Sequence, residues 1–154
     1  MDIDRLTELL TLPGVQTPTA YGDLFFIYDP SMDLPAERQM PFATIVSADT
    51  YESVSNLDRP GVYRLNLGLT KATYTSLFGN PPAARDDAGV VDTGHDYTAL
   101  DTVMPHPVYA PQHWICVLSP SDGTIDRIQP LITESYEFAV RRYDNFKGRQ
   151  NING

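Results

Sequence analysis

Hydrophobic and polar residues alternate most regularly over residues 62–69, VYRLNLGL. Tyr63 and three leucines fall on one side of this stretch, and Arg64 and Asn66 fall on the other. Successive side chains of a strand point to opposite faces. The pattern therefore predicts a half-buried strand, antiparallel to its neighbours.

Three further stretches are rich in aromatic and β-branched residues and predict strands. They are 22–28 (GDLFFIY), 42–48 (FATIVSA) and 113–118 (HWICVL). A proline or a glycine follows each of these segments in the chain, and we expect it to lie in a turn that ends the strand.

Apolar residues recur at helical spacing in 2–12, 71–78 and 124–145. Asp2 begins the first segment and Thr70 precedes the second, and both are good N-caps. Pro130 lies inside the third segment, where a proline costs about 3 kcal/mol unless it occupies the first turn. We therefore expect 124–128 to be a separate turn and the main helix to open near Pro130.

The predicted order is α-β-β-β-α-β-α, which is typical of an α+β fold: an antiparallel sheet with helices on one face. The length of 154 residues fits one domain. We expect this domain to span 1–145 and the tail, 146–154, to fray.

Charge is distributed unevenly and excludes some partners. The net charge is −9, and residues 1–58 hold ten acids and two bases. Such a surface repels a phosphate backbone, so a nucleic-acid-binding role is disfavoured. No apolar run approaches the ~20 residues of a membrane span. A single Cys and an acidic N-terminus predict a soluble protein of the cytoplasm without a signal peptide.

Four long motifs resemble a bacterial family of unknown function over about residues 20–145. They are FFIYDP, MPFATIV, LDRPGVYRLNLG and DYTALDTVMPHPVYAPQHW. More distantly, residues 113–143, with the Ser135–Tyr136 pair, resemble the end of MmcQ/YjbR-like proteins. That second resemblance implies a frataxin-like fold. A winged DNA-binding role suggested for that group conflicts with the charge of this chain.

Residues 95–118 contain every histidine of the chain, its only Trp and its only Cys. The preceding segment, 80–94, is small and acidic and is expected to be a mobile loop. Residues 95–112 carry too many apolar side chains to remain free in solvent, so we expect them to pack against the domain. Cys116 lies in an apolar run and is expected to be an inert core residue.

The three histidines give two interpretations. His95, His106 and His113 could bind a metal ion, with Asp96 or Asp101 completing the site. Their spacings of eleven and seven residues match no compact metal motif. Separate structural histidines are the favoured interpretation, and no cofactor is expected.

His106 lies between two prolines, which fix the direction of its imidazole. If the 95–112 segment folds over the sheet, His106, Arg64 and Asn66 could converge on an anionic ligand. Tyr109 and His95 are further candidate contacts in the same segment. A rigid structural strap is the alternative role for this segment.

No nucleophile elbow and no phosphate-binding glycine motif is present in the sequence. The favoured function is therefore a non-catalytic domain that binds a partner protein or a small ligand. One alternative is an enzyme that uses the histidine-bearing loop 95–112, with or without a metal. The other is a nucleic-acid-binding module. The sequence identifies neither the ligand nor the oligomeric state.

Overall fold

The computed structural model describes residues 1–153, with the side chains of 1–150. Its strands form one antiparallel sheet of seven strands in the order β1-β3-β4-β5-β7-β6, and β2 also pairs with β3. This confirms the predicted α+β class. The elements are α1 (Ile3–Leu10), β1 (Val15–Gln16), β2 (Thr19–Ala20), β3 (Asp23–Tyr28), the 3₁₀ helix η1 (Ala36–Arg38), β4 (Ala43–Val46), β5 (Arg64–Gly68), α2 (Lys71–Phe78), β6 (Met104–Pro105), η2 (Ala110–Gln112), β7 (Trp114–Leu118) and α3 (Asp122–Asn153).

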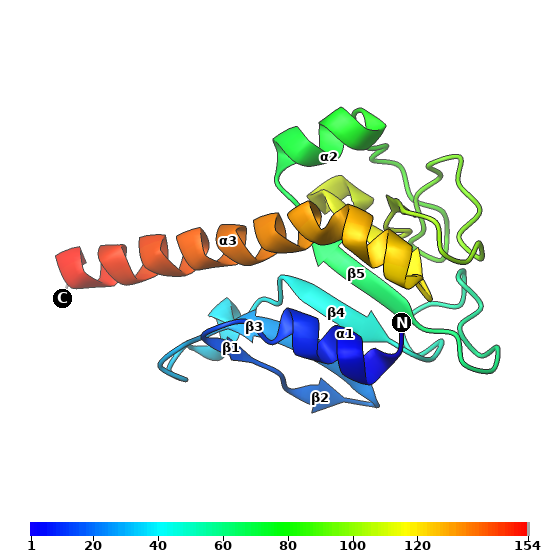
Figure 1. Cartoon of the computed structure of the whole chain (residues 1–154). Coiled ribbons are helices and arrows are strands. Elements are labelled where there is room, and N and C mark those ends of the chain that lie inside the picture. The colour runs from blue at the N-terminus through cyan, green and yellow to red at the C-terminus, as the bar shows by residue number, and fades with distance from the viewer. Residues whose placement is uncertain (154) are drawn as a thin grey trace.

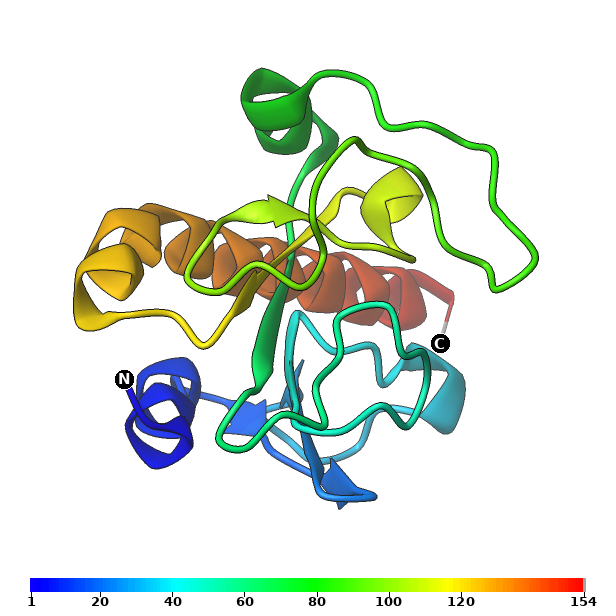
Figure 2. The same ribbon diagram turned by 90° about the vertical axis from the view of Figure 1, so that its right-hand side faces the viewer.

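The sheet has a helix face and a loop face. Helices α1 and α3 lie across one face (Figure 1), where Leu6, Leu65 and Ile132 belong to the main core. The opposite face is covered by the long connections on either side of β5 (Figure 2), and a smaller core there includes Leu57 and Met104. Both connections therefore act as a third layer made of loops.

Strand β5 is buried on both faces, so the prediction of a half-buried strand was wrong. Leu65 and Leu67 face the main core, while Arg64 and Asn66 face the loops, and all four are at most 2% exposed. The predicted alternation of side chains between the two faces of β5 is confirmed. The loops that cover the polar side of β5 replace the solvent expected there.

The predicted helix caps are present. The Asp2 carboxylate accepts a hydrogen bond of 2.8 Å from the Arg5 amide at the start of α1. Thr70 accepts one of 3.3 Å from the Thr73 amide at the start of α2. Gly79 ends α2 with a φ of 76°, a left-handed conformation that favours glycine.

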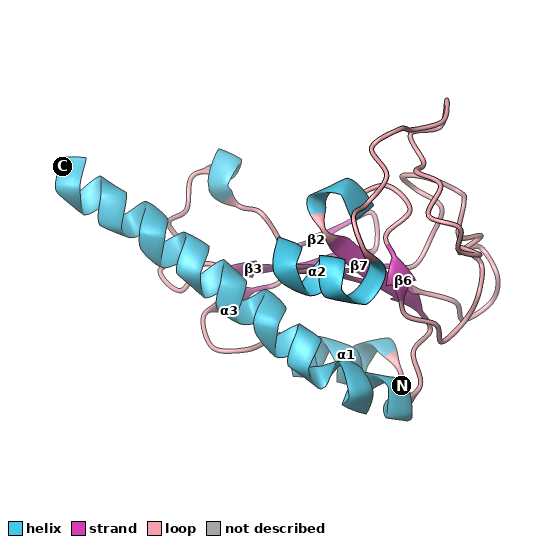
Figure 3. Cartoon of the chain, turned by 90° about the horizontal axis from the view of Figure 1, so that it is seen from above, coloured by secondary structure: helices cyan, strands magenta, loops and turns pink. Residues whose placement is uncertain are grey.

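Helix α3 is continuous across Pro130, which corrects the predicted break near that residue. Figure 1 shows the first turns of α3 leaning at an angle to the rest, a bend of the kind that proline introduces. The helix also runs beyond residue 145 to Asn153 and projects past the sheet (Figure 3). The division into a domain, 1–145, and a frayed tail, 146–154, stays a prediction, and Gly154 lies outside the described residues.

The segment between α2 and β7 packs down mainly in its second half, as predicted. Tyr97 and Met104 are buried there, although Leu100 and Tyr109 are about half exposed. In the first half, Arg85 pairs with Val91 in an isolated bridge. Mobility of 80–94 stays a prediction. None of the described helices combines the length and the apolar character needed to cross a membrane.

Candidate functional site

Arg64 is the centre of a buried polar network on the loop face. Its Nε donates to Asn66 Oδ1 at 2.9 Å, and its Nη1 donates to Glu52 Oε1 at 2.6 Å and to Ser55 Oγ at 2.9 Å. Glu52 and Ser55 come from the connection between β4 and β5. The ion pair and these hydrogen bonds therefore fasten that connection to the sheet.

Asn66 extends this network sideways across the strands. Its Nδ2 donates to Thr44 Oγ1 at 2.9 Å, because Thr44 and Asn66 are register partners in β4 and β5. Arg64 and Asn66 thus bind each other and the protein's own side chains. Glu52 already balances the guanidinium charge, and a role for these two residues in binding an anion stays a prediction.

His106 lies in the same layer and is 2% exposed. Its Nδ1 accepts hydrogen bonds from the amides of Val108 and Tyr109, both at 3.0 Å, so the ring proton resides on Nε2. Burial, and secondarily the charge of Arg64, hold the pKa of His106 well below its usual range. His106 is therefore a neutral imidazole that fixes the turn leading to Tyr109.

The other two histidines lie in different surroundings. His95 is exposed and packs edge-on against Phe78, with ring centroids 5.6 Å apart. His113 packs against Tyr74 at 5.7 Å. Within the described part of the chain, no three His, Cys, Asp or Glu side chains are placed to hold a metal ion. The structure does not bring the three histidines together in a shared metal site.

Cys116 is a buried core residue, as the sequence indicated. Burial raises the pKa of its thiol to about 12, so the reactive thiolate is not formed near neutral pH. The sulfur lies 3.7 Å from the carbonyl oxygen of Pro105.

Asp23 is a functional candidate that the sequence analysis missed. It is fully buried at the start of β3, and its Oδ1 accepts a hydrogen bond of 3.2 Å from the Ser47 amide. Its Oδ2 is buried without a hydrogen-bond partner among the described residues. Burial raises the pKa of Asp23, and the Ser47 hydrogen bond and Arg64 offset part of this effect. In the sequence, the only sign of this candidate is an acidic residue next to the aromatic residues of a predicted strand.

Three exposed tyrosines lie around Tyr51, and we call Tyr21, Tyr51 and Tyr109 the tyrosine surface. Their exposed fractions are 83%, 57% and 53%. Desolvation raises the pKa of Tyr51, and the Asp23 carboxylate and the phenol groups of Tyr21 and Tyr109 raise it further, so each of these three groups lies near Tyr51. Tyr109 also packs on His106, with ring centroids 5.0 Å apart. Of these three, the sequence analysis singled out only Tyr109.

The backbone presents Tyr21 at some cost. Tyr21 and Gly22 connect β2 to β3 with φ values of 55° and 83°, the combination of a two-residue hairpin of the primed type. A left-handed conformation costs a non-glycine residue about 1–2 kcal/mol. Met32 and four other non-glycine residues share this conformation, so the exposed ring of Tyr21 rather than its backbone makes it a candidate contact residue.

A family model described as "Family of unknown function (DUF6194)" matches residues 1–149. The chain belongs to the DUF6194 family. This agrees with the resemblance to a family of unknown function seen in the motifs. No curated protein and no solved structure matches the chain.

In this DUF6194 protein, the predicted ligand contacts divide into two groups. His106, Tyr109, Arg64 and Asn66 lie in or beside the loop layer, where Arg64 is near enough to His106 to influence its pKa. His95 packs against α2 instead. The site that the geometry supports therefore consists of the tyrosine surface, with Asp23 near Tyr51 and His106 packed against Tyr109.

Proposed function

We propose that this DUF6194 protein is a non-catalytic binding domain whose tyrosine surface holds a cationic group of a partner protein or small ligand. The observation that carries this proposal is that two exposed tyrosines from separate loops, Tyr21 and Tyr109, and the buried Asp23 all lie near the exposed Tyr51. Loops on a rigid sheet are the usual location of binding residues.

Tyrosine suits such a surface for a physical reason. Its ring offers a large contact area, has a polar hydroxyl and loses little conformational entropy on binding, so tyrosine is enriched at recognition surfaces.

The charge of the surrounding loop favours a cation. The connection between β4 and β5, residues 47–63, contains the acids Asp49, Glu52 and Asp58 and one base, Arg59. Glu52 is paired with Arg64, so Asp49 and Asp58 supply the remaining negative charge of this loop. The faces of tyrosine rings attract ammonium and guanidinium groups, by roughly 0.5–1 kcal/mol at exposed sites. Aromatic rings and acidic residues together therefore complement a positively charged ligand.

The competing function is an enzyme that uses the loop 95–112. A specific observation in its favour is the raised pKa of Asp23, which suits a proton donor or acceptor. The state of His106 weighs against it, because Nδ1 is already occupied by two backbone amides. Binding without chemistry therefore remains the better account.

Tetramethylammonium is the simplest probe, with neopentyl alcohol as its neutral counterpart. NMR titration of the tyrosine ring resonances should show millimolar binding of the cation and at least fivefold weaker binding of the alcohol. The variants Tyr21→Asn and Tyr51→Ala should each weaken tetramethylammonium binding at least threefold. Asn tolerates the left-handed turn, so Tyr21→Asn removes the ring while the hairpin stays intact.

Met32 provides a matched control for Tyr21. It is 75% exposed and has a φ of 54°, and it is not part of the tyrosine surface. Met32→Asn should leave tetramethylammonium binding unchanged. Equal binding of the neutral alcohol, or equal binding by the Tyr21→Asn and Met32→Asn variants, would contradict the proposal.

We also infer a cytoplasmic location, which the single thiol supports. We further infer that residues 113–143 are related to MmcQ/YjbR-like proteins and that the fold is frataxin-like. The Trp-led strand and the Ser135–Tyr136 pair support this inference.

A further inference from the structure

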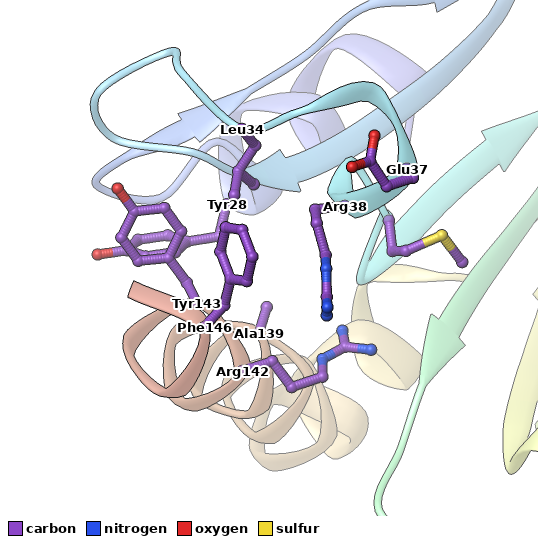
Figure 4. Close-up of a pocket in the computed structure, with 9 residues that line it drawn as sticks. Tyr28, Leu34, Glu37, Arg38, Ala139, Arg142, Tyr143 and Phe146 are labelled. Atoms are coloured by element: carbon purple, nitrogen blue, oxygen red, sulfur yellow. The ribbon is translucent and has the colours of Figure 1, made fainter. Parts of the chain in front are cut away.

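A cavity of about 240 Å³ lies between η1 and α3, away from the tyrosine surface. Its floor on α3 is formed by residues at positions i, i+3, i+4 and i+7, which share one side of a helix. These are Ala139, Arg142, Tyr143 and Phe146. The opposite wall includes Arg38 of η1, and Tyr28 of β3 contributes an aromatic side (Figure 4).

Two arginines enter this cavity from opposite walls. Figure 4 shows the guanidinium groups of Arg38 and Arg142 directed toward each other, while the carboxylate of Glu37 points away from them. Among the described side chains, neither guanidinium is within 4.0 Å of a carboxylate. Two cationic, solvent-exposed side chains thus line one cavity in a protein whose net charge is −9.

Aromatic rings line the space beside the two charges. The guanidinium of Arg38 lies 4.6 Å from the centroid of the Phe146 ring, which holds it in place. Tyr28 and Tyr143 pack edge-to-face at 5.2 Å and complete the wall. The cavity therefore has a cationic end and a flat apolar side.

The loop that carries Arg38 is anchored at two points. The Asp29 carboxylate accepts hydrogen bonds from the amides of Asp33 and Leu34, at 3.2 and 3.3 Å. Asp33 in turn forms a 2.8 Å ion pair with Lys147 of α3. These contacts hold the loop against the helix, so the cavity exists before any ligand arrives.

We propose that this cavity binds a small ligand that carries a carboxylate or phosphate monoester on a flat unsaturated ring. The anion lies between Arg38 and Arg142, and the ring lies against Phe146 and Tyr143. This site is independent of the function proposed for the tyrosine surface. Nothing in the comparisons with known proteins assigns it.

The chemistry of the two arginines supports this ligand class. Guanidinium groups form paired hydrogen bonds with carboxylates and phosphates, and two of them on facing walls can bind one anion together. Desolvation lowers the pKa of Arg142, although the residue as a whole remains exposed. Pockets for drug-sized ligands occupy about 300–1,000 Å³. The smaller volume here limits the ligand to about one ring and one anionic group.

Isothermal titration calorimetry with four probes tests the proposal on the full chain. Phenyl phosphate and benzoate combine an anion with a ring, inorganic phosphate lacks the ring, and benzyl alcohol lacks the charge. The first pair should bind at least tenfold more tightly than the second pair. The stronger of the two aromatic anions then identifies phosphate or carboxylate as the preferred anion.

Three variants that each remove one positive charge test which arginines bind the anion. Arg38→Gln and Arg142→Gln should each weaken phenyl phosphate binding at least tenfold. Arg141→Gln is the matched control, because Arg141 precedes Arg142 on the same helix and loses the same charge but does not line the cavity. It should change the affinity less than twofold. Circular dichroism should show the same helix content in all three variants.

Three outcomes would overturn the site. The first is equal loss of binding in the Arg141→Gln and Arg142→Gln variants, which would reflect only the overall charge. The second is binding of benzyl alcohol or inorganic phosphate as tight as that of phenyl phosphate. The third is no detectable binding of either aromatic anion at 20-fold excess over a millimolar protein sample.

Discussion

Arg64 shows how one buried charge organises a loop. Its side chain is 2% exposed and that of Glu52 is 12% exposed, so both charged groups are largely desolvated. A buried ion pair gains little net stability, but removing one partner leaves the other charge uncompensated. The pair therefore determines where the connection between β4 and β5 lies.

Replacing Arg64 alone should be costly. We expect Arg64→Met to lower the free energy of unfolding by about 3–5 kcal/mol, because Glu52 keeps its charge without a partner. Adding Glu52→Gln should recover at least about 1 kcal/mol. Urea unfolding monitored by circular dichroism provides the measurement. A double variant no more stable than Arg64→Met would mean that the ion pair is not the source of the loss.

At the scale of elements, the pairing of β5 with β7 depends on a close contact. Gly68 is the register partner of Trp114, and the indole ring covers its Cα. A Cβ at residue 68 would lie 2.9 Å from an indole carbon, which is too close for a normal contact. The glycine thus allows Trp114 to cover the end of β5.

Gly68→Ala should displace the indole and destabilise the fold. We expect a loss of about 1–3 kcal/mol, the usual cost of overpacking a tight site. Trp114 is the only tryptophan, so its fluorescence emission should shift to the red as the ring moves toward solvent. Gly123→Ala, whose Cβ would meet only Ser121 Oγ at 4.0 Å, should leave the emission unchanged. Equal spectra for both variants would contradict this explanation.

At the scale of the whole molecule, the sheet is enclosed by helices on one side and by loops on the other. This enclosure buries titratable groups such as Cys116 and Tyr63, and burial raises the pKa of each to about 12. Both groups are neutral when protonated. The folded state therefore holds their protons at pH values where the unfolded chain releases them.

This difference predicts alkaline destabilisation. The stability that Cys116 contributes is complete below its unfolded pKa of 9.0 and is lost as the pH rises from there toward 12. Between pH 8 and 9.5 the wild type should lose roughly 1 kcal/mol more than Cys116→Ala does. Urea unfolding at both pH values measures the difference. Equal losses in the two proteins would show that the thiol is not the titrating group.

Local patterns in the sequence were enough to predict most elements. The caps at Asp2 and Thr70, the stop at Gly79 and the alternation of β5 all depend on neighbouring residues, and all are present. The two-residue strands β1, β2 and β6 were missed because two residues carry no period. The continuity of α3 across Pro130 was missed because packing of the helix against the sheet outweighs a local penalty.

The sequence by itself determined the α+β class, the family motifs and the face of β5 on which Arg64 lies. The tertiary structure alone decided which residues meet. The loops covered the polar face of β5, the tyrosine surface formed from three separate connections, and Arg38 came to face Arg142. The physical reason is the distance along the chain over which each effect acts. Capping and periodicity act over a few residues, whereas burial, ion pairing and cavities depend on segments up to about a hundred residues apart in the chain.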